Sequence, residues 1–128
     1  MSHVTKISVQ LKSKEAIVCA AERMGFKIEE NAFARAWGSQ TVQAELVLRL
    51  ERYDVGFVRG KDGSFDAVGD FEMGSAIQRL GKDLEWFRNE YSVQAAVLEA
   101  RKAGFTASVR YTDEKAREAE ITLVEVQA

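Results

Sequence analysis

Residues 39–70, SQTVQAELVLRLERYDVGFVRGKDGSFDAVGD, are the stretch from which the fold of this chain can be argued. From residue 44 to residue 51 apolar and polar side chains alternate, which is the period of a strand with one face toward a core. The expected core face carries Ala44, Leu46, Leu48 and Leu50. The other face, which includes Val47, is expected to meet water.

The same stretch predicts two further strands joined by tight connections. The alternation resumes at Tyr53, and residues 60–63, GKDG, suit a hairpin loop because glycine adopts a positive φ without strain. Phe65 begins the return strand. Connections this short join antiparallel neighbours, since a parallel crossover needs about a dozen residues or more. Residues 39–70 are therefore predicted to form a three-stranded antiparallel meander with one face buried.

The segment before the meander predicts a β-α-β unit. Alternation over residues 5–11 is typical of a half-buried strand. Good helix formers follow Ser13, which suits an N-cap, and Gly25 stands where a left-handed C-cap belongs. A short strand begins at Phe26, and residues 31–38 fit either another short strand or an irregular arm.

One long helix and two strands are predicted after the meander. Apolar residues at steps of three and four form the stripe of an amphipathic helix: Leu80, Leu84, Phe87, Tyr91, Ala95 and Leu98. A break near Gly81, or near the weakly helical residues 91–93, would divide it into two helices. Gly104 ends the helix, and strands are expected over residues 105–111 and 121–126.

These elements predict one α+β domain over residues 1–128. The order is β-α-β-β-β-β-α-β-β, with a largely antiparallel sheet and two main helices that can pack on one of its faces. A helix ending in Gly-Phe leads into a strand twice, at residues 25–26 and at residues 104–105. This repetition fits two related halves that share one sheet, although glycine is also the usual end of a helix.

Composition and charge limit the classes of function. The 128 residues are 46% hydrophobic and 30% charged, with a net charge of −2. Such a chain folds, and it has no general attraction to nucleic acid or anionic lipid. Cys19 is the only cysteine, so no intrachain disulfide and no cysteine metal cluster are expected. The N-terminus lacks the apolar h-region of a secretory signal, and no apolar run reaches membrane-spanning length. We therefore expect a soluble cytoplasmic protein.

Five residues are candidates for binding a small anionic, nucleotide-like ligand: His3, Arg35, Trp37, Gln40 and Arg59. Arginine can hold a phosphate or carboxylate through two parallel hydrogen bonds, and tryptophan can stack on a base. His3 is the only histidine and titrates near neutrality, although it fits equally a strand-end residue bonded to a loop. The alternative for the others is a tryptophan that fills the sheet edge beside solvated arginines.

No catalytic, metal or cofactor site is predicted. The carboxylates that could suggest a paired-acid or hard-metal site are Glu45, Asp54, Asp66 and Asp70. Asp54 and Asp66 occupy strand positions that are expected to face water, and no loop supplies oxygen ligands at calcium-binding spacing. The glycines of residues 56–69 lack the lysine and the strand–loop–helix setting of a phosphate-binding loop. We therefore predict that the chain is not an enzyme.

Trp86 and Tyr91 are candidates for a partner interface. Trp86 stands next to Phe87 on the predicted helix, so the two side chains cannot both face one core. A partly exposed tryptophan is a typical anchor for a partner or a second subunit. The alternative is a helix that covers two surfaces of its own protein.

Several motifs, in order, resemble a known family: MSHVTKI at the start, the central GSQTVQAELVLRL, the block YDVGFVRGKDGSFDAVGD and the late EYSVQAAVLEARKAGF. The family is the cyanobacterial and plastid-encoded one called hypothetical chloroplast reading frame thirty-five, a domain of unknown function. The similarity covers most of the chain and is weakest over residues 71–82 and after Thr112. The resemblance implies a small accessory protein, and some relatives are encoded beside AAA-type ATPases, which is an association and not a mechanism. It implies no particular activity.

The missing catalytic pattern and the edge strands near each terminus favour a small non-enzymatic binding or adaptor protein that self-associates. Its partner is expected to be another protein or a second copy of the chain, met through a sheet edge or the surface around Trp86. The alternative is a binder of a small anionic, nucleotide-like ligand that uses Arg35, Trp37, Gln40 and Arg59. A nucleic-acid partner is not favoured, because the chain is acidic and lacks the basic and aromatic strand pattern of RNA-binding sheets. No membrane partner is expected.

Overall fold

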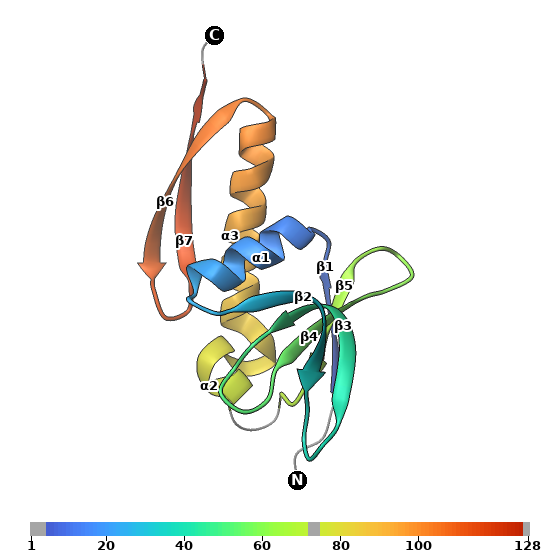
Figure 1. Ribbon diagram of the computed structural model, residues 1–128. Coiled ribbons are helices and arrows are strands. Elements are labelled where there is room, and N and C mark those ends of the chain that lie inside the picture. The colour runs from blue at the N-terminus through green and yellow to red at the C-terminus, as the bar shows by residue number, and fades with distance from the viewer. Residues whose placement is uncertain (1–4, 72–74, 127–128) are drawn as a thin grey trace.

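The computed structural model describes residues 5–71 and 75–126 as a five-stranded sheet, a two-stranded hairpin and the helices between them (Figure 1). The first half contains β1 (Thr5–Leu11), α1 (Lys14–Arg23), β2 (Ile28–Arg35), β3 (Thr41–Leu48), β4 (Val55–Arg59) and β5 (Phe65–Gly69). The second half contains α2 (Ser75–Leu80), the 3-10 turn η1 (Lys82–Leu84), α3 (Glu85–Lys102), β6 (Phe105–Asp113) and β7 (Glu118–Glu125). The predicted α+β class, with antiparallel strands and two main helices, is confirmed.

The larger sheet is built around the predicted meander. Its strand order is β1-β5-β4-β3-β2, and every neighbouring pair is antiparallel. The turn between β4 and β5 is closed where the backbone N–H of Gly60 donates to the carbonyl oxygen of Ser64 at 2.7 Å. β2 pairs with β3 from Ile28↔Leu48 to Arg35↔Thr41. Residues 31–35 therefore belong to a strand, as the first of the two alternatives for residues 31–38 predicted, and do not form an irregular arm.

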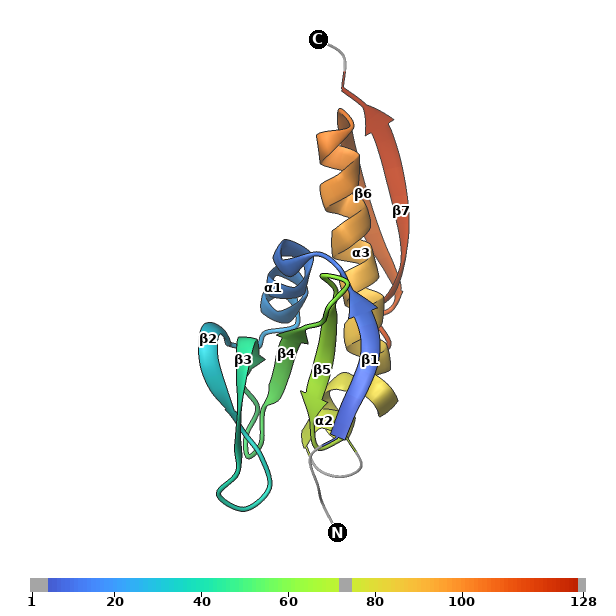
Figure 2. The ribbon, with the colours of Figure 1, turned by 90° about the vertical axis from the view of Figure 1, so that its right-hand side faces the viewer.

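β6 and β7 do not join the larger sheet, and this corrects the expectation of two halves that share one sheet. The two strands pair with each other, from Phe105↔Glu125 to Asp113↔Glu118, and pack on α3. Figure 2 shows α3 running from beside the larger sheet to the hairpin. The 18 residues of α3 extend roughly 27 Å, so the chain has passed the end of the larger sheet before β6 begins.

The main core lies between one face of the larger sheet and the helices. The fully buried side chains that the sheet contributes are Leu46, Leu48, Val55, Phe57, Phe65 and Ala67. Ile17 of α1, Leu80 of α2 and Phe87 of α3 pack against them. Phe87 stacks on Phe57 with the ring centroids 5.5 Å apart. The expected core positions are thus confirmed for Leu46 and Leu48 of β3 and for Leu50 just after it, which are all buried.

A small second cluster lies outside the main core and corrects two expected positions. Ala44 belongs to this cluster, and Val47 is fully buried in it beside Ala34 although it was expected to meet water. A Cβ atom added at Gly56 would lie 3.1 Å from the Ala44 Cβ and 3.4 Å from the Ala34 Cβ. The small residues therefore let β2 approach β4 closely and cover Val47. Alternation within β3 cannot reveal a cover that a different strand supplies.

The predicted break in the long helix lies at Gly81, and α3 continues unbroken through residues 91–93. Gly81 has a φ of +85°, which suits glycine and separates α2 from η1. Phe87 of α3 belongs to the main core, whereas Val93 and Val97 are buried where α3 contacts β6 and β7. The helix therefore covers two surfaces of its own protein. Of the helices in residues 5–71 and 75–126, none combines the length and apolarity needed to cross a membrane.

Candidate functional site

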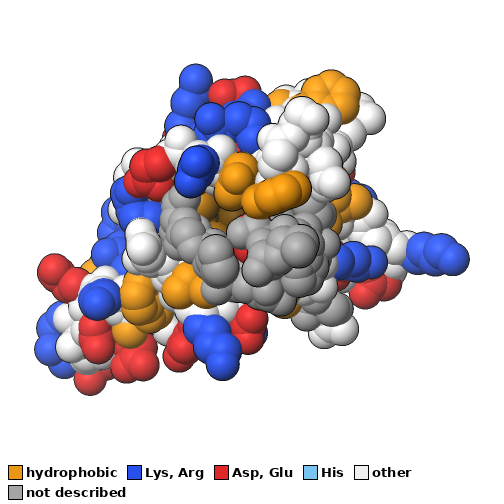
Figure 3. Space-filling view, turned by 90° about the horizontal axis from the view of Figure 1, so that it is seen from below, with side chains coloured by type: hydrophobic (Ala, Val, Ile, Leu, Met, Phe, Trp, Pro, Cys, Tyr) orange, Lys and Arg blue, Asp and Glu red, His pale blue; other side chains and the backbone are white. Residues whose placement is uncertain are grey.

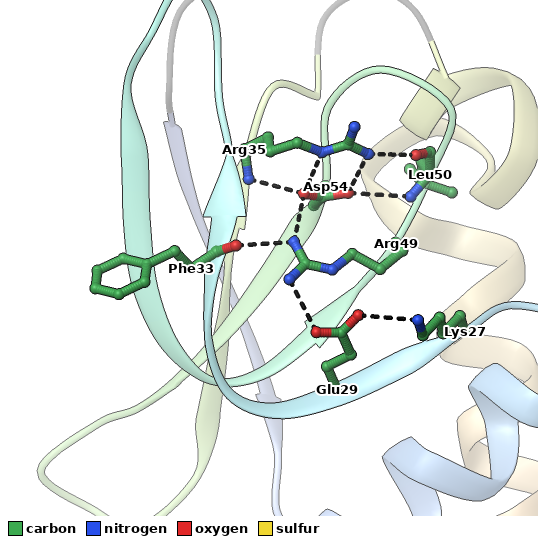
Figure 4. A network of polar contacts seen from close by, with 7 residues as sticks. All are labelled: Lys27, Glu29, Phe33, Arg35, Arg49, Leu50 and Asp54. Carbon is green, nitrogen blue, oxygen red and sulfur yellow. Dashed lines mark hydrogen bonds and ion pairs between the residues drawn. The ribbon is translucent and has the colours of Figure 1, made fainter.

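The most extensive polar network of the larger sheet surrounds Asp54, the residue just before β4 (Figure 4). Its carboxylate is fully buried and accepts five hydrogen bonds. Arg35 donates from its backbone N at 2.8 Å and from Nε and Nη2 at 2.9 Å each. Arg49 donates from Nη1 at 2.8 Å, and the backbone N of Leu50 donates at 3.2 Å. Asp54 therefore joins the end of β2 to the loop that leads from β3 to β4.

The burial of Asp54 corrects the expectation that this residue faces water. Alternation applies to residues inside a strand, and Asp54 precedes β4, where the backbone still belongs to the loop. Burial by itself raises the pKa of the carboxyl group, but the hydrogen bonds from Arg35, Leu50 and Arg49 outweigh it and hold the pKa below its usual range. The group is therefore an anion at neutral pH with its charge fully compensated.

A second layer of ion pairs extends the network along β2. Arg49 also donates to the carbonyl oxygen of Phe33 at 2.8 Å and to Glu29 Oε2 at 3.1 Å. Lys27 lies 3.4 Å from Glu29, and the hydrogen bonds from Arg49 and then Lys27 lower the pKa of that carboxyl group. Figure 4 shows the linked side chains running from Lys27 through Glu29 and Arg49 to Asp54 and Arg35. An incoming anion would have to displace Asp54 or Glu29, so the arrangement is suited to holding the strands together.

Trp37 and Gln40 lie in the turn between β2 and β3. The turn is closed by the backbone N of Ala36 donating to the carbonyl oxygen of Gln40 at 2.9 Å. Trp37 is 46% exposed, and Phe33, on β2, is 57% exposed. The two aromatic residues are therefore open to solvent on the same hairpin. Figure 3 views the molecule from below and shows Lys and Arg side chains (blue), Asp and Glu side chains (red) and hydrophobic side chains (orange) on this face.

Arg59 is the last residue of β4 and does not meet Arg35. It donates to both carboxylate oxygens of Glu45, at 3.0 and 2.9 Å, and its guanidinium lies 4.2 Å from the ring centre of Phe65. Arg35 is bound at the opposite end of β4, and five residues of strand span roughly 17 Å. The hollow of about 420 Å³ beside Arg59 is lined also by Lys14 and Glu45, and not by Arg35, Trp37 or Gln40. The structure does not bring the predicted ligand set together, and His3 lies outside the described residues.

Trp86 and Tyr91 both have contacts within the chain. The Trp86 ring packs on Gly81, where an added Cβ would lie 2.8 Å from it, and the amino group of Lys115 lies 5.2 Å from the ring centre. The hydroxyl oxygen of Tyr91 accepts from the backbone N of Lys12 and of Ser13 at 2.9 Å each. Tyr91 thus holds the start of α1 against α3. Both residues are half-buried, and a role in a partner interface stays a prediction.

Sequence reasoning missed a second buried carboxylate, Glu90 on α3. Its oxygens accept from the Tyr111 hydroxyl at 2.8 Å, from Arg117 Nε at 2.9 Å and from Gln94 Nε2 at 3.1 Å. The side chain is fully buried, and its partners Tyr111 and Arg117 come from the β6–β7 hairpin. The sequence does contain a sign of this burial, because Val93 and Val97 follow Glu90 at three and seven residues and lie on the same helix face. Glu90 fixes the hairpin on α3.

Exposed apolar side chains gather at the C-terminal end of β7. Leu123, Val124 and Val126 are 49%, 59% and 56% exposed. β7 has β6 on one side and no second neighbour in the described sheet. The backbone N of Val126 donates to the carbonyl oxygen of Gly104, so even-numbered residues turn their amides toward β6. The amides of Ile121 and Leu123 therefore point away from β6, toward the open edge.

A hollow of about 310 Å³ lies at the other end of β7, between that strand and α3. It is lined by Asn89, Ser92, Val93, Arg117, Glu118, Ala119 and Ile121. The apolar part of the lining comes from Val93, Ala119 and Ile121. β7 thus combines an open edge with exposed apolar side chains at one end and a partly apolar hollow at the other.

Comparison with known proteins identifies the family. The family model described as a protein of unknown function, DUF1257, matches residues 14–124. No curated protein and no solved structure matches the chain. The relation to cyanobacterial and plastid proteins stays an expectation from the sequence motifs. Because the match covers most of the chain, the protein belongs to the DUF1257 family.

Proposed function

We propose that this chain is a non-enzymatic binding domain that recognises a protein partner through the open edge of β7. The observation that carries the proposal is the position of its exposed apolar side chains. Five large hydrophobic side chains are exposed among the described residues, and Leu123, Val124 and Val126 are three of them. Leu123 and Val124 lie on β7 and Val126 follows directly after it, and the outer edge of β7 has no neighbour in the described sheet.

Such an edge suits strand addition. An extended partner segment can donate and accept main-chain hydrogen bonds along the edge, while its side chains contact alternate residues of β7. An open edge with apolar side chains is otherwise a risk for uncontrolled aggregation, and proteins usually protect it. A specific partner on β7 would supply that protection and bury Leu123 and Val124.

The polar groups in the described part of the chain support a binding role over an enzymatic one. The buried carboxylates of Asp54 and Glu90 are each compensated by arginine side chains of the same chain. The alternative of an anionic-ligand binder has no comparable support, because Arg35 and Arg59 are bound to carboxylates at opposite ends of β4.

Site-specific photo-cross-linking in the native host cells tests the proposal. Val124 is replaced by benzoylphenylalanine, and Lys61, exposed in the β4–β5 turn, receives the same replacement as the matched control. We expect a discrete cross-linked protein product from position 124 and none from position 61. If position 124 gives no product, or if both positions give the same ones, the proposal is wrong.

A further inference from the structure

We infer that the partner at the β7 edge is a second copy of this chain, with the two β7 strands antiparallel about a two-fold axis at Thr122. The inference rests on the proposed function and names the partner. It follows from the charges along the strand, from the fit between its two ends, and from the incomplete burial of the β6–β7 hairpin.

The charges along β7 favour antiparallel self-pairing. Glu118 and Glu120 lie in its first half, and the apolar residues Leu123, Val124 and Val126 lie at its end. A parallel, in-register pair would place each glutamate opposite its own copy, and like charges directly opposite one another are destabilising. In the antiparallel pair centred on Thr122, Glu120 lies opposite Val124 and Glu118 opposite Val126 of the second copy. No two acidic side chains then face each other.

The two ends of β7 also complement each other in shape. Leu123 pairs with Ala107 of β6, so its side chain lies on the face of the hairpin that α3 covers, yet it remains 49% exposed. In the antiparallel pair Leu123 lies opposite Ile121 of the second copy. Ile121 lines the hollow of about 310 Å³ together with Val93 and Ala119. Each copy therefore directs an exposed leucine toward a partly apolar hollow of the other, and the two-fold axis makes the contact twice.

The pairing also uses the free main-chain groups of the strand. The amides of Ile121 and Leu123 point to the open edge, as the bond from Val126 to Gly104 indicates. In the proposed register Ile121 of each copy lies opposite Leu123 of the other, and the two residues exchange main-chain hydrogen bonds. The product is a four-stranded sheet in the order β6-β7-β7-β6, with both α3 helices on one face.

Self-association would extend and further bury the β6–β7 hairpin, which is poorly covered in the single chain. No residue of β6 or β7 is fully covered in the single chain. An isolated two-stranded hairpin is marginal in water, whereas three or more strands with an apolar face are more stable. The exposed positions of β6, the other strand of the hairpin, carry the polar residues Thr106, Ser108 and Arg110. Exposed apolar side chains that a second copy could bury are therefore found on β7 rather than on β6.

The first test is the mass of the purified full chain by sedimentation equilibrium. We expect a dimer whose dissociation constant rises at least about tenfold in Leu123→Lys, because the lysine would lose its hydration at the contact. Ser108→Lys is the matched control, since it adds the same charge to the outer position of β6, and it should remain dimeric. Circular dichroism establishes that both variants are folded. A chain that stays monomeric at every concentration, or a dimer that survives Leu123→Lys, overturns the inference.

A second test checks the register without depending on Leu123. In a Cys19→Ser background, Thr122→Cys places two thiols opposite each other at the two-fold axis, in a pair without mutual backbone hydrogen bonds whose side chains lie close. Mild oxidation should yield a covalent dimer from Thr122→Cys and far less from Glu120→Cys, which lies opposite Val124. Equal yields from both variants, or none from either, overturn the register.

The two proposals fail differently. A monomeric chain that still cross-links to another protein from position 124 keeps the proposed function and overturns the second copy as its partner. A monomeric chain that gives no cross-link at position 124 overturns both.

Discussion

The larger sheet is tied together by the buried carboxylate of Asp54 and the β6–β7 hairpin is tied to α3 by that of Glu90, but the two regions differ in how far their own residues are buried. Asp54 is held by Arg35 and Arg49 beside a core of fully buried side chains. Glu90 is held by Arg117 and Tyr111 beneath a hairpin in which no residue is fully buried. The larger sheet has helices on one face. Outside that main core, the small cluster of Ala34, Ala44 and Val47 is also buried. The hairpin has α3 on one face only.

The difference supports the proposal that the hairpin, rather than the larger sheet, is the surface for a partner. A region whose polar groups are paired and whose apolar side chains are buried has little left to gain from association. The hairpin keeps an open strand edge and exposed apolar side chains, so association there can still bury apolar area. The larger sheet is therefore the stable scaffold, and the hairpin is the region in which we expect function.

The largest effect is expected from Asp54→Ala in the larger sheet. The substitution removes the acceptor shared by Arg35 and Arg49 and by the backbone N of Leu50. Breaking a buried ion pair from one side costs about 3–5 kcal/mol of the free energy of unfolding. Urea denaturation followed by tryptophan fluorescence measures it. Glu51→Ala, which removes only an exposed ion pair with Arg79, is the control and should change little. Equal effects of the two substitutions would contradict the role given to Asp54.

Glu90→Gln should weaken the hairpin while leaving the larger sheet intact. Hydrogen bonds to a charged partner contribute about 1.5–3 kcal/mol, and this substitution removes the charge that Arg117 and Tyr111 contact. We expect faster hydrogen exchange of the β6 and β7 amides, with unchanged exchange in β3 and β4. Glu120→Gln, whose partner Arg110 is exposed, serves as the control. A uniform change across both regions would mean that they unfold as one unit.

Acid should weaken the larger sheet through Asp54. Because its pKa lies below the unfolded value of about 3.9, its contribution to stability is complete above that pH and is lost as the pH falls through the folded pKa. The loss is about 1.4 kcal/mol for each unit by which the pKa is lowered. Urea midpoints measured between about pH 5 and about pH 2 test this, with Asp54→Asn expected to depend less on pH. Identical pH profiles for the two proteins would refute it.

The smallest effect is expected from Trp37→Ser on the larger sheet. Trp37 is 46% exposed, so its loss should change the free energy of unfolding by no more than about 0.5 kcal/mol and should leave association unchanged. Val124→Ser on the hairpin is the matched comparison, because Val124 is also exposed, and it should weaken the proposed dimer. Sedimentation equilibrium and urea denaturation measure both. If Trp37→Ser makes the chain monomeric and Val124→Ser does not, the interface is the turn between β2 and β3 instead.

Much of the larger sheet could be predicted because its signals are local. Alternation and the glycines of residues 60–63 predicted the meander, and Gly81 marked a helix end. The burial of Val47 could not be predicted in this way, since its cover comes from Ala34 on β2. The site was harder still. Arg35 and Arg59 were both recognised as candidate anion ligands, yet each is bound to a carboxylate of the chain and they lie at opposite ends of β4.

The sequence by itself determined the order of the elements, the positions of most turns and the faces of β3 and α3 that carry large apolar side chains. These depend on the period of a strand or a helix and on the φ angles that glycine allows, which are properties of a few neighbouring residues. Only the tertiary structure decided that β6 and β7 form their own sheet, that Asp54 and Glu90 are buried, and that the edge of β7 stays open. Those outcomes depend on free energies between segments far apart in the chain, where packing and the pairing of charges select one arrangement among many that the local pattern allows.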